Sequence, residues 1–182
     1  MTIEALNTLE DQTALILAIP LIGIFLMCFL FSGSLGSSIL IMLVAALIEV
    51  NLFAILWYGD LKLNYMSISM VIIAYAFTVH YAILLTKGFD ISQAAPTNPT
   101  NLKRREHKVK MGLTRFASAI IHAGASSFLL VLSMAASESY VMYAFFRIWL
   151  GAVFFSVLHS LVLLPVLLSF FGLIQPGDRT KL

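Results

Sequence analysis

The side chains able to do chemistry in this sequence are a few ionisable groups inside long apolar runs. Glu49 lies in one run, and His80, His122 and His159 lie in three others. If these runs cross a membrane, such groups are costly and usually face a protein interior, a cavity or an ion pathway. A carboxylate binds a proton or a cation, and a neutral imidazole takes up a proton near neutral pH. Glu49 and His80 are therefore candidates for proton or ion coupling.

The same side chains also have structural interpretations, which the sequence leaves open. Glu49 can hydrogen-bond to a neighbouring helix, and a neutral His80 can donate to a backbone carbonyl. Pro165 leaves a carbonyl about one turn upstream without its donor, and His159 is near enough to compensate. This favours packing for His159. The candidates for helix packing or a polar network are Ala76, His122, Gly124, His159 and Pro165.

The sequence shows no pattern typical of an enzyme. It has no Gly-rich phosphate loop, no Cys or His pair at metal-ligand spacing, and no supported Ser-His-Asp arrangement. The single cysteine, Cys28, rules out an intramolecular disulfide framework. We therefore expect no catalytic residues, no metal, no cofactor and no nucleic-acid partner.

Composition indicates that the medium around this chain is lipid. Of 182 residues, 60% are hydrophobic and 11% are charged, and the mean hydropathy is +0.97. Soluble proteins carry about 25% charged residues. In hydrocarbon, backbone polar groups must pair within the segment, so long apolar runs have to be helical. The sequence predicts an all-α, polytopic membrane bundle, in the plasma membrane or an endosomal membrane.

Five runs are long enough to cross about 30 Å of hydrocarbon. The run rich in small residues, 116–136, is expected at the buried centre of the bundle, because small side chains let helix backbones approach closely. The second and fifth runs should meet lipid more. The expected divisions are an exoplasmic tail 1–13 without a signal peptide, the spans 14–32, 37–58, 66–86, 116–136 and 143–173, a basic loop 87–115, and a tail 174–182.

The distribution of Lys and Arg predicts the orientation. The loop 87–115 contains most of the cations, and the C-terminal tail carries Arg179 and Lys181. Cytoplasmic loops carry such an excess, so the loop and the tail should be cytoplasmic and the N-terminus outside. Within the loop, residues Leu102 to Met111 favour a short basic helix. These charges either enforce topology alone or bind anionic headgroups.

Several motifs, in order, resemble the last five membrane helices of the Patched and Dispatched group. That group includes Niemann–Pick type C-related transporters and lies within the RND superfamily. The stretches that carry the resemblance are LWYGDLKLNYMSISM, AFTVHY, Met111-Gly112, HAGASSFLLVLSMA, FFRIWLG and LHSLVLLPVLLSFFG. The resemblance covers residues 14 to 173 and implies half of an RND-type membrane domain.

Two departures from the family pattern bear on function. Ala76 stands at the family's glycine, and His80 stands at the acidic residue associated with ion coupling. An imidazole does not replace a carboxylate as a sodium ligand, so the substitution leaves proton coupling as the alternative. The large exoplasmic domains and the other membrane half of the family have no counterpart here. The chain therefore resembles a partial unit.

The resemblance implies a membrane protein for sterol or lipid transport or binding, with the bilayer, a sterol or another lipid as its partner. A missing N-terminal half or a separate membrane protein would be a further partner. Two alternatives stay open: a non-transporting structural or regulatory bundle, and an inactive fragment of a longer transporter.

The predicted orientation can be tested by labelling single cysteines in intact cells. With Cys28 replaced by serine, we expect Glu138→Cys to react with a membrane-impermeant maleimide added outside. Lys103→Cys and Lys110→Cys should react only after permeabilisation, because loops rich in Lys and Arg stay cytoplasmic. Reaction of Lys110→Cys in intact cells would contradict this topology.

Overall fold

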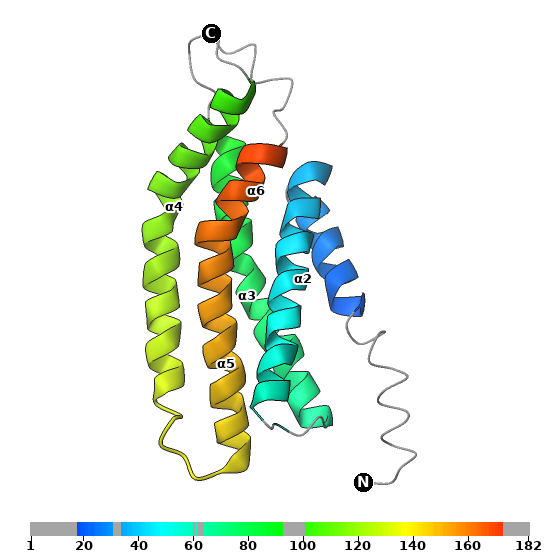
Figure 1. The fold of residues 1–182 in the computed structure, drawn as a ribbon, viewed down its shortest axis with the longest axis vertical. Helices are drawn as coiled ribbons and strands as arrows, with labels where there is room; N and C mark the ends of the chain where they lie inside the picture. The colour runs from blue at the N-terminus through cyan, green and yellow to red at the C-terminus, as the bar shows by residue number, and fades with distance from the viewer. Residues whose placement is uncertain (1–17, 31–33, 60, 62–63, 93–100, 173–182) are drawn as a thin grey trace.

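The computed structural model describes residues 18–30, 34–59, 61, 64–92 and 101–172, which form a bundle of helices and contain no strand (Figure 1). An apolar helix covers Ala18–Leu30. It is followed by α2 (Leu35–Tyr58), α3 (Tyr65–Ile91), α4 (Asn101–Leu132), α5 (Tyr140–Leu158), a π-helix η1 (His159–Leu163) and α6 (Leu164–Phe171). The last three are continuous along the chain.

Helix lengths confirm the prediction of an all-α bundle able to span a membrane. Four helical stretches are long and apolar enough to cross one: Leu35–Tyr58, Tyr65–Ile91, Leu102–Leu132 and Tyr140–Phe171. At about 1.5 Å per residue, the shortest of these extends about 36 Å. The first predicted span, 14–32, is described only over Ala18–Leu30, and its ends lie outside the described residues.

Side-chain caps set where α2 and α3 begin. The hydroxyl of Ser34 accepts a hydrogen bond from the Ser37 N–H at 3.5 Å, and Asn64 Oδ1 accepts from the Ser67 N–H at 2.8 Å. Ser and Asn are favoured at these positions because they satisfy N–H groups that have no partner within the helix. The N–H of Gly59 bonds to the Ile55 carbonyl and closes the last turn of α2.

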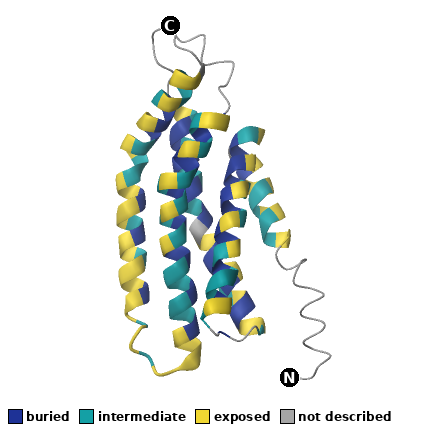
Figure 2. Ribbon diagram, in the orientation of Figure 1, coloured by how far each residue is buried: buried dark blue, intermediate teal, exposed yellow. Residues whose placement is uncertain are grey.

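The helix at the centre of the bundle is α3, and the expectation that the small-residue helix would be central is wrong. In the apolar part of α3, 53% of residues are buried, compared with 17% in α4. The α2 span, at 44%, and the fifth span, at 33%, are also more buried than α4. Figure 2 shows this as buried residues along α3 and exposed residues along the outer face of α4.

The reason is the placement of the small residues around α4. Gly112 and Gly124 are buried at crossings with other helices, whereas Ser118, Ala119 and Ser126 face outward. A high content of small residues allows close packing, but only those on the contacting face produce it.

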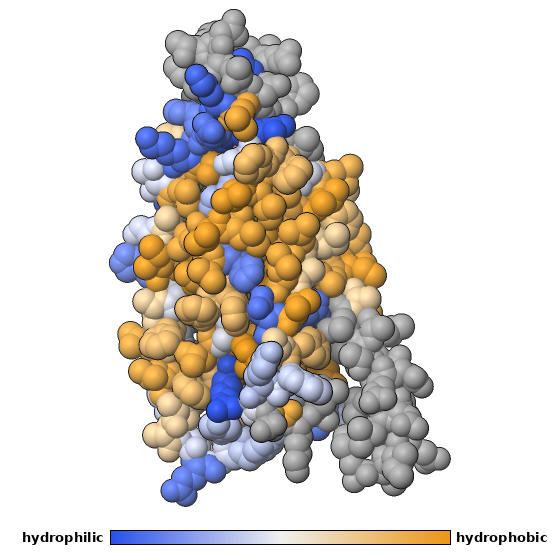
Figure 3. Space-filling view, viewed as in Figure 1, coloured by the Kyte–Doolittle hydropathy of each residue, from blue (hydrophilic) through white to orange (hydrophobic). Residues whose placement is uncertain are grey.

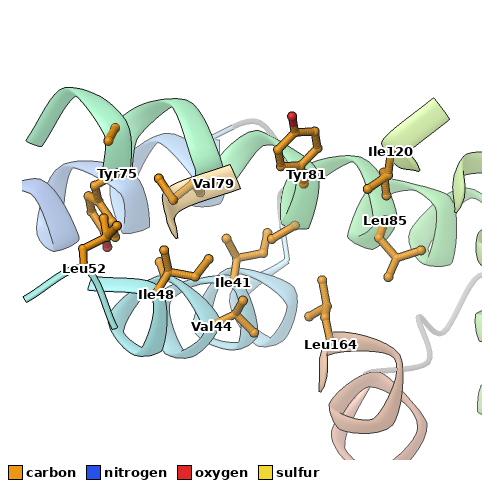
Figure 4. Close-up of a cluster of buried hydrophobic side chains, with 14 of the residues drawn as sticks. Ile41, Val44, Ile48, Leu52, Tyr75, Val79, Tyr81, Leu85, Ile120 and Leu164 are labelled. Carbon is orange, nitrogen blue, oxygen red and sulfur yellow. The ribbon is translucent and has the colours of Figure 1, made fainter. Parts of the chain in front are cut away.

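The core forms where one face of α2 meets α3. Ile41, Val44, Ile48 and Leu52 recur at helical spacing on α2 and are each at most 2% exposed. Figure 4 shows them opposite Tyr75, Val79, Tyr81 and Leu85 of α3, with Ile120 of α4 and Leu164 of α6 at one end. Because lipid tails are as apolar as these side chains, dense packing rather than water exclusion holds this face together.

At their closest crossing, α3 and α4 meet through glycines. A Cβ added to Gly88 would lie 3.1 Å from the Gly112 Cα, and one added to Gly112 would lie 3.1 Å from the Phe89 amide nitrogen. The two backbones therefore touch directly.

The predicted basic helix at Leu102 to Met111 is helical but not separate. It forms the first turns of α4, which runs for 32 residues from Asn101 to Leu132. At about 48 Å this helix is longer than the roughly 30 Å hydrocarbon layer, so its basic start can extend beyond the layer.

The glycine crossing leads to a stability prediction with an internal control. We expect Gly112→Val to lower the free energy of unfolding by about 1–3 kcal/mol, because the new side chain meets backbone rather than movable side chains. Gly23 has no atom within 4 Å of an added Cβ. Gly23→Val should therefore leave stability nearly unchanged, with both variants measured by denaturant titration in detergent micelles. Equal losses in the two variants would show that the α3–α4 crossing does not limit stability.

Candidate functional site

Glu49 lies on the buried face of α2 and is 7% exposed. Tyr75, on α3, is 1% exposed and lies within electrostatic range of both Glu49 and Cys28 of the Ala18–Leu30 helix. In Figure 4 the ring of Tyr75 points from α3 toward α2, beside Leu52. A carboxyl and a thiol from two other helices thus interact electrostatically with the phenol of Tyr75. We call Glu49, Tyr75 and Cys28 the Glu49 cluster.

The sequence pattern does not mark Tyr75 as part of a site. The only available signal was a tyrosine hydroxyl inside an apolar run, which tertiary packing then placed near Glu49.

His80 is half-buried on a different part of α3, among aromatic rings. Its Nδ1–H donates to the carbonyl of Phe77, as the structural interpretation required. The imidazole lies 4.0 Å from the Tyr81 ring and 5.0 Å from the Phe77 ring, measured between centroids. With Nδ1 as the donor, Nε2 carries the lone pair and is the atom that can take up a proton.

Two contacts connect this region to other helices. The Phe77 ring lies 5.2 Å from the Trp149 ring of α5, and the Tyr81 hydroxyl lies 3.4 Å from the Ser127 hydroxyl of α4. His80 is therefore near the junction of α3, α4 and α5.

The two coupling candidates occupy different sides of α3. Tyr75, the α3 neighbour of Glu49, and His80 are five positions apart, which corresponds to about 140° around the helix axis. In the described part of the chain, Tyr75 interacts electrostatically with Glu49 of α2 and with Cys28 of Ala18–Leu30, whereas the ring neighbours of His80 contact α4 and α5. The fold does not bring the two residues into one shared contact.

The remaining predicted residues have distinct surroundings. His122 is exposed on α4, and its ring bonds to the Ser118 carbonyl at 2.6 Å. Ala76 is also exposed. Gly124 is buried, and a Cβ there would lie 2.6 Å from Cγ2 of Val157 on α5. Of these three, only Gly124 lies at a close helix crossing.

His159 and Pro165 belong to the irregular part of the fifth span. His159 Nδ1 lies 2.7 Å from the Phe155 carbonyl, so this ring does not reach the Leu161 carbonyl. Pro165 has no N–H to donate, and the helix adjusts to this by forming the π-helical turn η1. In that turn the Leu164 N–H donates to the His159 carbonyl, five residues earlier. Ser160 is buried beside it, and its hydroxyl has no hydrogen-bond partner among the described residues.

Arg147 connects α5 to the turn after α2 through a hydrogen bond. Its Nη1 donates to the Gly59 carbonyl at 2.9 Å, and its guanidinium lies 4.6 Å from the Tyr143 ring centroid. These contacts support an anchoring role for Arg147.

The start of α4 and the end of α6 form what we call the basic end of the bundle. Its charged side chains make specific contacts with other helices, which orienting the chain in a membrane would not require. The Lys108 ammonium is buried over the Phe89 ring at 5.2 Å, and Arg105 Nη1 donates to the Phe170 carbonyl at the end of α6. The Ser37 hydroxyl donates to Asp90 Oδ1 at 3.0 Å. These contacts link α3 to α4, α4 to α6, and α2 to α3.

An apolar groove of about 330 Å³ runs between α2 and α6 near this end. Its lining comes from Gly36, Ile39, Leu40, Leu43, Leu167 and Phe171. No group of three or more His, Cys, Asp or Glu in the described ranges is arranged to bind a metal.

Comparison with known proteins identifies relatives over nearly the whole chain, although no family model matches it. Over 93% of its length the chain is 27% identical to NPC intracellular cholesterol transporter 1 of Sus scrofa, of which it covers 13%. It is 26% identical over 91% of its length to a Niemann-Pick type C1-related protein of Toxoplasma gondii, covering 13% of that protein. It is 25% identical over 98% of its length to NPC intracellular cholesterol transporter 1 homolog 1b of Drosophila melanogaster, covering 14%.

The chain thus spans about one seventh of the length of the curated relatives that it matches. The matches confirm the resemblance that the motifs indicated. In sequence, the chain resembles part of the membrane region of Patched-like and Niemann–Pick C1-like proteins of the RND superfamily.

Proposed function

We propose that this chain forms part of the membrane region of a protein that transports or binds sterols or other lipids. The observation that carries the proposal is the similarity of nearly the whole chain to proteins named as cholesterol transporters. The four span-length apolar helices are consistent with it. Because the chain matches so small a part of its relatives, complementary membrane helices, from the same or another protein, would complete the unit.

The finer proposal is that protonation of Glu49 and His80 is linked to lipid binding. Support comes from a carboxyl group buried between helices, where a change in charge must be compensated by packing or hydration. His80 lies on α3, and Glu49 interacts electrostatically with Tyr75 of α3, the helix that packs against α2, α4, α5 and α6. A protonation event at either one therefore acts on the same central element, although the two side chains lie on different sides of it.

His80 suits a proton switch because of its tautomer. Its Nδ1–H is committed to the Phe77 carbonyl, so protonation adds a second N–H at Nε2. That new donor and positive charge must find an acceptor, water or an aromatic face. The nearest structures able to respond are Tyr81 and the Phe77–Trp149 contact. Protonation would then loosen or shift α3 against α5.

One observation favours a second function, a non-transporting structural or regulatory bundle. The described contacts do not place Glu49 and His80 in one crevice. His80 already donates a hydrogen bond to a carbonyl of its own helix. A bundle that only associates with another membrane protein needs neither residue to face a pathway.

Sterol binding across pH tests the proton-linked proposal. For the full chain in liposomes, we expect affinity for a fluorescent sterol to fall about tenfold as pH decreases from about 8 to about 5, the range in which imidazoles titrate. His80→Ala should flatten this dependence, because its Nε2 no longer takes up a proton. Glu49→Gln should change the part of the pH dependence of sterol affinity that does not come from His80.

His122→Ala is the matched control, because it removes an exposed histidine from another helix. Its profile should equal that of the wild type. Identical profiles for His80→Ala and the wild type would remove His80 from the mechanism. Absence of sterol binding in every protein at every pH would support the structural bundle instead.

A further inference from the structure

The groove between α2 and α6 presents an apolar concavity to the medium around the bundle. Ile39, Leu43 and Phe171 are each exposed, while Leu40 forms part of the buried floor. The volume of about 330 Å³ lies at the small end of the range for ligand clefts, about 300–1,000 Å³. With a lining of aliphatic and aromatic side chains, the groove favours a hydrocarbon occupant.

A cationic side chain contacts α6, the helix that forms one wall of the groove. Arg105 of α4 donates to the carbonyl of Phe170, whose neighbour Phe171 lines the groove. Arg104 precedes it on the same helix turn. The Nε atoms of both arginines are buried and have no hydrogen-bond partner within the described part of the chain. A desolvated donor without a partner is costly, and an acceptor at this point would remove that cost.

The surface shows the same juxtaposition. In Figure 3, hydrophobic side chains cover much of the bundle, and hydrophilic ones gather at the end where α4 begins as well as at the opposite end and in the middle of this face. Figure 1 places α6 and the start of α2 at that same end. An apolar channel therefore meets a cationic rim, which is the pattern of a lipid tail joined to an anionic headgroup.

We propose that this groove is a binding site for an anionic glycerophospholipid, with one acyl chain against Leu43 and Leu167 and the phosphate at Arg104 and Arg105. Guanidinium groups bind phosphate through paired, charge-assisted hydrogen bonds, and Arg105 keeps further N–H donors after its bond to Phe170. A sterol would fill the apolar part but offers only a neutral hydroxyl to two cations. Charge complementarity therefore selects the phospholipid.

The site is independent of sterol transport by this chain. It would fix the end of α6 to α4 through a bound lipid, at the same end where Lys108 and Phe89 already join α3 to α4. The basic residues at the start of α4 would then recognise a particular lipid as well as orient the chain.

Photo-crosslinking of lipids to the full chain in phosphatidylcholine nanodiscs tests the proposal. The probes are phosphatidylserine and phosphatidylcholine, each with a diazirine on one acyl chain, and labelled residues are mapped by mass spectrometry. We expect phosphatidylserine to label the groove residues well above phosphatidylcholine. Arg104→Gln combined with Arg105→Gln should lower phosphatidylserine labelling roughly 20- to 30-fold, as expected for two cations near an anionic lipid.

The charge control is Lys103→Gln combined with Lys110→Gln, which removes the same net charge from exposed positions on the same helix. Its labelling should stay within about twofold of the wild type, because exposed charges act weakly. If the double arginine variant does not fold, Arg104→Gln alone is used as the test, because the hydrogen bond to Phe170 of α6 comes from Arg105. It should lower labelling about fivefold.

The groove itself is tested by Leu43→Trp, which should fill it and lower labelling there by both probes. Leu130→Trp, at an exposed leucine on α4, should have no such effect. Equal labelling by the two probes, equal losses in the arginine and lysine variants, or an unchanged pattern in Leu43→Trp would overturn the site. Displacement of the probe by cholesterol, with the arginine variants behaving as the wild type, would identify a sterol groove instead.

Discussion

Close backbone contact between helices is the interaction on which the rest of this structure depends. In hydrocarbon there is no water to drive helices together, so association relies on packing surfaces that fit. Gly88 and Gly112 let α3 and α4 touch at backbone distance, and Gly124 lets α4 approach α5. With α4 and α5 held in this way, α3 is enclosed by α2, α4, α5 and α6 and carries both His80 and Tyr75.

The second constraint is that polar side chains must find partners without water. Many do so on their own helix, by donating to a carbonyl one turn earlier. Examples are Thr86 to Ala82, Ser126 to His122 and Ser169 to Pro165, all at about the normal hydrogen-bond length. His80 and His159 follow the same principle through their rings. The polar groups whose described interactions join different helices, the Glu49 cluster and Arg105 at the start of α4, are therefore the informative ones.

The two proposals concern two separate regions of the molecule. The Glu49 cluster and His80 lie within the bundle on α2, α3 and Ala18–Leu30, where a proton is the smallest ligand that could alter packing. The groove beside α6 lies at the basic end, where lipid can approach from the side. Under the two proposals, the first region would respond to protons and the second to the composition of the membrane around it.

Much of this organisation was determined by the sequence alone. Apolar runs longer than the hydrocarbon layer is thick must be helical, which predicted five spans, and four of them are helices long enough to cross a membrane. The basic pattern at Leu102 to Met111 separately predicted a helix, which forms the start of α4. Ordered motifs across the whole chain indicated the family resemblance that the comparisons confirmed. Pro165 indicated an irregularity in the fifth span, although its form, a π-helix, was not predictable from composition.

Only the tertiary structure decided which face of each helix meets which neighbour. Composition suggested α4 as the centre, but small residues spread around a helix do not say which of them make contact, and α3 proved central. The rotation of α3 separates His80 from Glu49 and places Tyr75 beside Glu49 instead. Likewise, the bond from Arg105 to Phe170 joins residues 65 positions apart. Such pairings depend on helix rotation and crossing angle, and these are set by the packing of all the helices together rather than by any one segment.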